Sequence, residues 1–70
     1  MSKVIGRLFK NAVSGRYVVD TTGRVLTCGE CCDVRVDSAW VPTCVEHDGK
    51  DYYFTDADVP MQGAEVRYSV

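Results

Sequence analysis

The chain has almost none of the sequence patterns that build helices or membrane segments. Its apolar residues do not recur with the 3.6-residue period of an amphipathic helix, and it has no repeat or low-complexity stretch. No segment approaches the ~20 consecutive apolar residues that span a bilayer. The opening segment, Met1 to Lys10, is interrupted by charges and lacks the apolar core of a signal peptide. We therefore expect a cytoplasmic protein with no membrane partner.

The usual signs of an enzyme are also missing. The chain has a single histidine, His47, and neither a Gly-rich phosphate-binding loop nor a nucleophile motif. Its carboxylates are scattered along the sequence rather than paired. We expect a protein that is not an enzyme.

The pattern that is present predicts β-structure. Seventy residues make one domain, residues 1–70, and a chain this short buries only ~60% of its unfolded surface. Such domains commonly need a metal, disulfides or a partner. Alternating and β-branched residues predict strands near 4–9, 16–20, 24–27, 33–37, 40–47, 52–54 and 64–70. The predicted fold is all-β: a single small domain, an antiparallel meander of five to seven short strands, with a zinc staple between hairpins. It would form an open barrel or a packed sheet.

Glycine and proline punctuate this pattern. Gly6 inside the first strand suggests a bulge, and Gly23 suits the positive-φ position of a hairpin. Pro42 cannot donate a ladder hydrogen bond, so it suggests an edge position or a bulge. Asp48-Gly49 is a strong tight-turn signal.

The cysteines and the histidine form the most informative motif. Cys28 and Cys31 make C-x2-C, and after twelve intervening residues Cys44 and His47 make C-x2-H. Two close ligand pairs about a hairpin apart are typical of a tetrahedral Zn²⁺ site. We therefore predict structural zinc held by Cys28, Cys31, Cys44 and His47. Four protein ligands would close the site to substrate, so the metal would support the fold rather than catalyse.

The adjacent cysteines leave alternatives open. If a strand starts near Cys32, this side chain shares a face with Val34, which predicts a small buried apolar role. Cys31 would then lie in the preceding turn. A Cys28–Cys32 pair has C-x3-C spacing, which zinc also tolerates. A disulfide remains a further alternative, with Cys28–Cys44 the preferred bridge, although a reducing cytoplasm disfavours it.

Charge is distributed unevenly. Residues 1–27 carry five cations against Asp20, a net charge of +4, and residues 28–70 carry nine acids against three cations, a net −6. An acidic surface attracts a basic partner and repels a phosphate backbone. The predicted partner contacts are Asp48, Asp51, Tyr53, Asp56 and Asp58. The alternative is a nucleic-acid-binding module whose basic stripe consists of Lys3, Arg7, Lys10, Arg16 and Arg24.

The aromatic residues fit a core better than a stacking platform for nucleic acid. Tyr52 and Phe54 share one face of a predicted strand and Tyr53 points to the other, between acidic neighbours. We assign one face to the core and the other to protein contact. Trp40 is also predicted to lie in the core.

Several short segments resemble one known family. They are Cys28-Gly29-Glu30-Cys31, Trp40-Val41-Pro42-Thr43, Glu46-His47-Asp48-Gly49, Ile5-Gly6-Arg7-Leu8 and Ser14-Gly15-Arg16-Tyr17. Together they look like the segments of an uncharacterised family of small proteins from phages and mobile elements of Gram-positive bacteria. The resemblance implies a compact β domain and a mobile-element origin, without an assigned activity. Cys44 departs from the family's pattern, which makes a complete metal site particular to this chain.

The chain is also similar in size and acidity to small zinc-containing anti-CRISPR proteins, which bind a Cas nuclease. We therefore expect a zinc-stapled interaction module that binds and inhibits a nucleic-acid enzyme of a bacterial host, with a Cas nuclease as the leading candidate. It would be a monomer or a small homo-oligomer. A structural small subunit of a phage complex is the other alternative.

Overall fold

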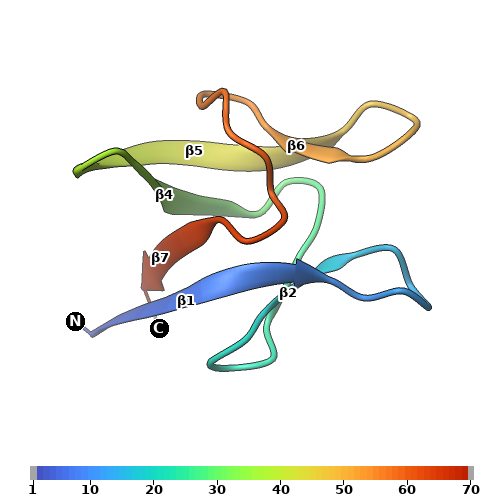
Figure 1. The fold of residues 1–70 in the computed structure, drawn as a ribbon, viewed down its shortest axis with the longest axis horizontal. Helices are drawn as coiled ribbons and strands as arrows, with labels where there is room; N and C mark the ends of the chain where they lie inside the picture. Colours follow the sequence, from blue (N-terminus) through green and yellow to red (C-terminus); the bar gives the residue numbers. More distant parts are fainter. Residues whose placement is uncertain (1, 70) are drawn as a thin grey trace.

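Seven antiparallel strands make up the fold in the computed structural model, which describes residues 2–69 (Figure 1). In chain order they are β1 (Lys3–Lys10), β2 (Tyr17–Val19), β3 (Val25–Leu26), β4 (Cys31–Val36), β5 (Ala39–His47), β6 (Tyr52–Phe54) and β7 (Glu65–Ser69). None of the described residues forms a helix with the length and apolar character needed to cross a membrane. The prediction of a single all-β domain with up to seven short strands is confirmed.

The strand order is β3-β2-β1-β7-β4-β5-β6. Two three-stranded meanders, β1–β3 and β4–β6, are joined by the last strand, which pairs with β1 on one side and with β4 on the other. The expected single meander is therefore corrected: β7 lies at the centre of the sheet. This pairing also places the two ends of the described chain side by side, with Lys3 opposite Ser69 (Figure 1).

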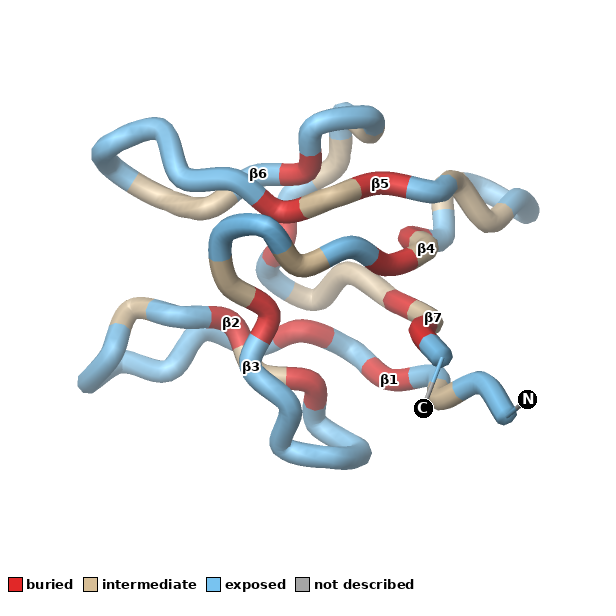
Figure 2. The backbone as a smooth tube through the Cα atoms, turned by 180° about the vertical axis from the view of Figure 1, so that it is seen from behind, coloured by how far each residue is buried: buried red, intermediate tan, exposed pale blue. Residues whose placement is uncertain are grey.

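The sheet curls into a half-barrel whose concave side holds the core (Figure 2). On β4, Cys32 and Val34 are buried while the alternate residue Arg35 is exposed. This alternation repeats on β7 and β2, as the pleat of a strand requires. Eleven side chains form the buried cluster: Leu8, Tyr17, Val19, Leu26, Cys32, Val34, Val45, Phe54, Met61, Val66 and Tyr68. Full burial of an aliphatic side chain of this size contributes ~1.5–3 kcal/mol.

This arrangement corrects the expectation for Trp40 and confirms one of the two for Pro42. Trp40 is only half-buried and lies on the convex side, where the guanidinium carbons of Arg67 and Arg35 sit 4.6 and 5.6 Å from its ring centroid. Cationic groups over the face of an indole are favourable, so the ring is covered by side chains outside the core. Pro42 pairs with Asp33 of β4, whereas β6 pairs only with residues 45–47 of β5. Pro42 thus lies where β5 has no strand partner on its second side, and the edge position is confirmed.

Gly6 allows the half-barrel to curl. β1 runs through Gly6 without a bulge, pairing it with Val66 of β7. A methyl group added at Gly6 would lie 2.6 Å from both Val19 Cγ1 and Thr21 Oγ1. The corner that follows β2 therefore packs directly on the bare backbone of β1, which only glycine permits.

A disulfide lies where the zinc staple was predicted. Cys31 and Cys44 stand directly opposite each other on β4 and β5, and their sulfur atoms are bonded. The prediction of a zinc staple between hairpins is corrected, as is the preference for a Cys28–Cys44 bridge: Cys28 is a free thiol in this structure. The bond joins residues 13 apart in sequence, at the point where β5 passes from β4 to β6 as its partner.

Removing this disulfide should destabilise the domain. Closing a loop of about 15 residues stabilises a protein by ~3 kcal/mol in the chain-entropy model, and for a domain of this size ~1 kcal/mol shifts Tm by about 4–8 °C. We expect the Cys31→Ser/Cys44→Ser variant to melt about 12–24 °C below the oxidised chain. Thermal unfolding followed by circular dichroism measures the difference.

Cys28→Ser is the matched control and should melt like the unsubstituted chain, because Cys28 is exposed and unbonded. Intact-mass measurement should find the oxidised chain two hydrogens lighter than the reduced one. A chain that instead carries one zinc ion and four thiols would overturn the disulfide and restore the metal site.

Gly6→Ala should also destabilise, because the new methyl group overlaps two side chains. Overpacking of this kind costs ~1–3 kcal/mol. In a Val19→Ala background the cost should shrink, since one of the overlapping groups is gone. Urea unfolding of the four chains of this double-mutant cycle measures the coupling; equal costs in both backgrounds would contradict the packing role given to Gly6.

Candidate functional site

The four predicted zinc ligands are not assembled in this structure. Cys44 and His47 both belong to the extended strand β5, three residues apart, so their side chains leave opposite faces of the sheet. Cys31 is the first residue of β4 rather than part of the preceding turn, and it is bonded to Cys44. Within residues 2–69 no three histidine, cysteine or carboxylate side chains are grouped closely enough to hold a metal. A C-x2-H pair inside a regular strand does not fit a shared ion.

The two remaining cysteines differ sharply. Cys32 is 7% exposed and packs in the core, which confirms its predicted apolar role. Burial, reinforced by the nearby Asp33 carboxylate, raises the pKa of the Cys32 thiol to about 11. Cys28 is exposed in a turn that the Glu30 amide closes by donating to the Thr27 carbonyl oxygen at 3.0 Å. The chain thus has one inert thiol and one accessible thiol.

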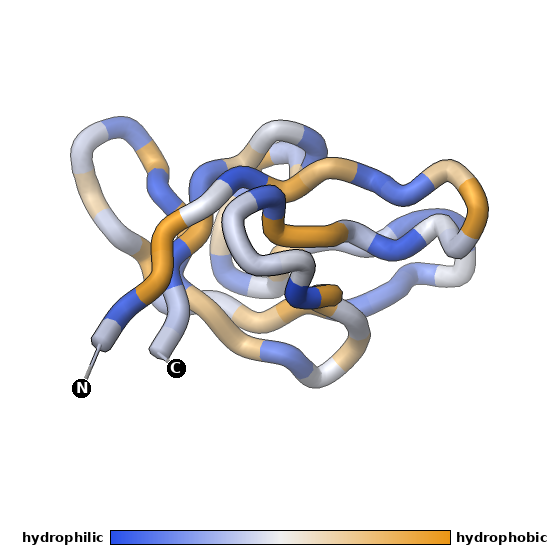
Figure 3. Tube along the Cα trace, turned by 90° about the horizontal axis from the view of Figure 1, so that it is seen from below, coloured by the Kyte–Doolittle hydropathy of each residue, from blue (hydrophilic) through white to orange (hydrophobic). Residues whose placement is uncertain are grey.

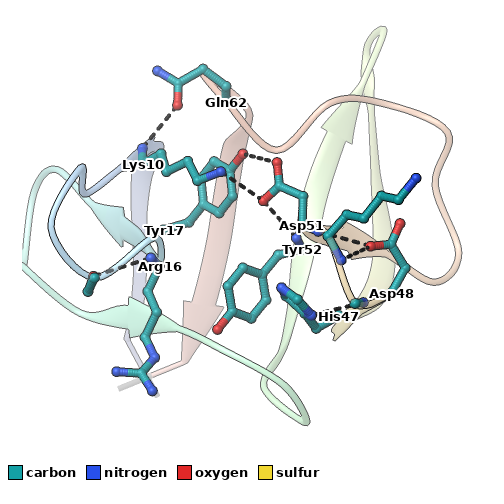
Figure 4. Close-up of polar contacts among 11 residues, drawn as sticks. Lys10, Arg16, Tyr17, His47, Asp48, Asp51, Tyr52 and Gln62 are labelled. Carbon is teal, nitrogen blue, oxygen red and sulfur yellow. Dashed lines mark hydrogen bonds and ion pairs between the residues drawn. The ribbon is translucent and has the colours of Figure 1, made fainter.

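His47 has a local structural role. Its Nδ1 accepts a hydrogen bond from the Gly49 amide at 3.0 Å, and its ring meets Tyr52 edge-on at 4.6 Å between centroids (Figure 4). The neighbouring Asp48 accepts hydrogen bonds from the amides of Lys50 and Asp51, at 2.8 and 2.9 Å. These bonds lower the pKa of the Asp48 carboxyl. Both side chains therefore shape the tight turn predicted at Asp48-Gly49.

A polar cluster of Lys10, Tyr17, Asp51 and Tyr52 closes one end of the half-barrel, where β1 and β2 approach the β5–β6 turn (Figure 4). We call this end the mouth. Asp51 forms an ion pair with Lys10 at 3.2 Å and accepts a hydrogen bond from the Tyr17 hydroxyl at 3.4 Å. The amide of Tyr52 donates to the same carboxylate at 2.8 Å and is the main reason why the pKa of Asp51 is lowered. Burial, followed by the Asp51 charge, raises the pKa of Tyr17. The cluster links strands far apart in sequence.

The five predicted partner contacts therefore do not form one exposed surface. Asp48 and Asp51 are occupied within the turn and the cluster. Tyr53 is 44% exposed on the convex side of β6, opposite Glu46 of β5. Two acids in the following loop are also exposed, Asp56 and Asp58. Asp56 accepts a hydrogen bond from the Thr55 hydroxyl. The described ion pairs include neither of these two acids nor Glu46.

The predicted basic stripe is also split. Lys10 points to Asp51 at the mouth, and Arg24 forms an ion pair with Glu30 at 2.9 Å while lying 4.8 Å from the centroid of the Tyr68 ring. Lys3 and Arg7 belong instead to the convex side of β1, where both alternate with buried residues. Five cations close in sequence therefore do not form one continuous surface.

Sequence reasoning missed an apolar surface on the convex side of the first meander. Ile5 and Phe9 of β1 are 48% and 44% exposed, and Val25 of β3 is 39% exposed. Val18 of β2 lies between Phe9 and Val25 and pairs with both, whereas Ile5 lies further along β1, opposite Arg67 of β7. We call these four residues the apolar strip. The contrast of orange apolar and blue polar segments along the strands is visible in Figure 3.

The signal for this strip was present in the sequence. The first three strands contain apolar doublets, Val4-Ile5, Leu8-Phe9, Val18-Val19 and Val25-Leu26. Because successive side chains point to opposite faces, each doublet places one apolar residue in the core and one outside. β4 lacks such doublets beyond its first two residues and alternates charge with valine.

Cations interrupt and flank the apolar strip. Arg7 lies between Ile5 and Phe9 on the same face of β1, and its Nη1 donates to the Gly63 carbonyl at 3.0 Å. Exposed Arg16 precedes the buried Tyr17, and Lys3 lies beyond Ile5. Asp20 is the nearby acid, and its carboxylate accepts a hydrogen bond from the Arg7 amide at 2.8 Å. The surface is therefore apolar with a basic margin.

Comparisons with known proteins agree with this fold. A crystal structure of a protein from Ruminococcus gnavus is 37% identical, with a TM-score of 0.80; the match covers 93% of this chain and 100% of that one. No curated protein matches. The expected phage origin and the anti-CRISPR likeness are not part of these matches and stay predictions. The family described as "Domain of unknown function (DUF5348)" matches residues 6–68. With nearly its whole length matched, the chain belongs to the DUF5348 family.

Proposed function

We propose that this domain is a non-enzymatic protein-binding module that holds an acidic protein segment on the convex side of β1–β3. The observation that carries the proposal is the apolar strip, Ile5, Phe9, Val18 and Val25. Monomeric proteins rarely expose contiguous apolar surface without a use for it, and patches rimmed by polar residues mark interaction sites. Phe9 lies beside Val18 and provides the aromatic anchor typical of interface centres.

The charge of the margin selects the partner. Arg7 and Arg16 lie within and beside the strip, so an acidic segment with apolar side chains is complementary to it. Nucleic acid fits less well, because Phe9 is the single aromatic side chain of the strip and its three aliphatic side chains offer bases no stacking surface. Three cations of the predicted basic stripe are also engaged elsewhere, Lys3 with Asp33, Lys10 with Asp51 and Arg24 with Glu30.

The contacts within the polar cluster support a non-enzymatic role. His47 is held by its own turn, and Asp51 is engaged by Lys10, Tyr17 and the Tyr52 amide. The contacts of these groups hold the half-barrel closed. They leave no carboxylate–histidine pair in the cluster for general acid–base chemistry.

Truncating the anchor tests the module. The immobilised chain should capture a protein from a bacterial lysate, and Phe9→Ser should abolish this capture. The affinity should fall about thirtyfold or more, since a central aromatic anchor often contributes about 2 kcal/mol or more. Bound protein should also decrease as salt rises, because the margin is charged. Quantitative mass spectrometry of the bound fraction, followed by titration of the purified partner, measures both effects.

Val13→Ser is the matched control, because Val13 is 98% exposed in the turn after β1 and lies outside the strip. It should retain the partner, and both variants should melt near the unsubstituted chain. Equal capture by Phe9→Ser and Val13→Ser would contradict the proposal. If the immobilised chain captures a second copy of itself through the strip, that copy is the occupant and the acidic segment is ruled out.

A second candidate function uses the opposite end of the sheet. Glu46, Tyr53, Asp56 and Asp58 are exposed near the edge strand β6, and their acids have no described ion-pair partner. An acidic surface of this kind suits the basic groove of a host nucleic-acid enzyme, such as a Cas nuclease, which the chain would inhibit. A phage or mobile-element origin would give such inhibition a purpose.

The two candidates are separable by variants. Inhibition of a Cas nuclease in a DNA-cleavage assay should weaken with Asp56→Lys/Asp58→Lys and with rising salt, while Phe9→Ser should leave it unchanged. The half-inhibitory concentration measures the effect. If the unsubstituted chain inhibits no nuclease in a panel of Cas effectors, the inhibitor function is wrong and the apolar strip remains as the binding surface.

A further inference from the structure

An unused thiol, Cys28, lies three residues before the disulfide-bonded Cys31 in the chain. Cys31 Sγ is 3.8 Å from the carbonyl oxygen of Gly29, so the turn that carries Cys28 packs next to the sulfur bridge. Gly29 has φ +86°, and its amide donates to the Val45 carbonyl at 2.9 Å, which ties this turn to β5. Cys28 is exposed, so solvent reaches its thiol.

The bridge itself is accessible. Both Cys31 and Cys44 line a shallow cavity of about 480 Å³ on the molecule, together with Thr43, Asp33 and Arg67. Cys31 is exposed and Cys44 is half-buried. A thiol can therefore approach the Cys31 sulfur, and a small reagent can reach the Cys44 sulfur once it is released.

We infer that Cys28, Cys31 and Cys44 form a thiol–disulfide exchange site in which Cys28 moves the bridge from Cys31–Cys44 to Cys28–Cys31. The Cys28 thiolate attacks Cys31 Sγ, the Cys31–Cys44 bond breaks, and Cys44 leaves as a thiolate that takes up the proton lost by Cys28. One disulfide and one thiol are present before and after, so no oxidant or reductant is consumed. The released Cys44 thiol is a site for small electrophiles or disulfides in the cavity.

The fourth cysteine does not take part. Cys32 also lines the cavity, but its side chain is only 7% exposed and packs in the core, and burial raises the pKa of its thiol. The thiolate is the nucleophile in such exchanges, and at neutral pH Cys32 supplies almost none. The exchange site therefore consists of three of the four cysteines, and it does not depend on the proposed partner surface.

Exchange would release β5 from β4. The bridge clamps the two strands where β5 leaves β4 and begins to pair with β6. After exchange the bridge lies between Cys28 and Cys31, and β4 and β5 are joined by ladder hydrogen bonds and core packing without a covalent bond. The two bridged forms thus differ in how firmly the β5–β6 end is held to the rest of the sheet.

Peptide mapping distinguishes the two bridged forms. Trypsin cuts after Arg24, Arg35 and Lys50, so Cys28, Cys31 and Cys32 fall in one peptide, residues 25–35, and Cys44 in another, residues 36–50. The oxidised chain is incubated at mildly alkaline pH with iodoacetamide, dilute enough that labelling is slower than exchange, then acidified and digested. We expect labelled Cys44 in a free 36–50 peptide and an internal disulfide in the 25–35 peptide.

Two variants decide the outcome. Cys28→Ser should keep the two peptides linked and Cys44 unlabelled, whereas Cys32→Ala should exchange like the unsubstituted chain. The inference is overturned if Cys44 stays protected in the unsubstituted chain, if Cys44 is labelled equally in Cys28→Ser, or if Cys32→Ala abolishes labelling. Linked peptides in Cys28→Ser also verify the starting bridge, so a negative result cannot arise from its absence.

Discussion

The alternation of side chains along extended strands decides which residues of this domain can meet. On β4 it sends Cys32 and Val34 into the core and Cys31 outward, and on β5 it places Cys44 outward beside Cys31. The same rule separates Cys44 from His47, three residues later on the same strand. One geometric constraint thus joins two cysteines in a disulfide and divides a sequence motif that is otherwise typical of a zinc site.

Curling gives the two faces of the sheet different roles. The concave face buries one side of every strand, and the mouth is held by polar contacts between distant segments, centred on Asp51 with Lys10 and Tyr17. The convex face differs in character between the two meanders. Over β4, β7 and β5 it carries a charged network in which Asp33 binds Arg67 and Arg67 covers Trp40. Over β1–β3 it carries the apolar strip together with Lys3 and Arg7, which is why the binding surface is proposed there.

Much of the fold could be predicted from local pattern. The strands, the positive-φ glycine of the β2–β3 hairpin, the Asp48-Gly49 turn and the burial of Cys32 all follow from period and turn chemistry. The candidate surfaces could be predicted only in part. Charge counts along the chain cannot show that Lys10 and Asp51, from segments of opposite net charge, neutralise each other across the mouth. The apolar doublets did contain the signal for the strip, because two neighbouring apolar residues cannot both face one core.

The sequence by itself determined that this is a small β domain, which residues alternate between two faces, and where its turns fall, because these depend on neighbours along the chain. The tertiary structure alone decided the strand order, with β7 at the centre, and the direct opposition of Cys31 and Cys44. It also decided which exposed residues lie side by side. These properties depend on pairing between residues far apart in sequence, and the many registers open to short alternating strands are distinguished only when the whole core is packed at once.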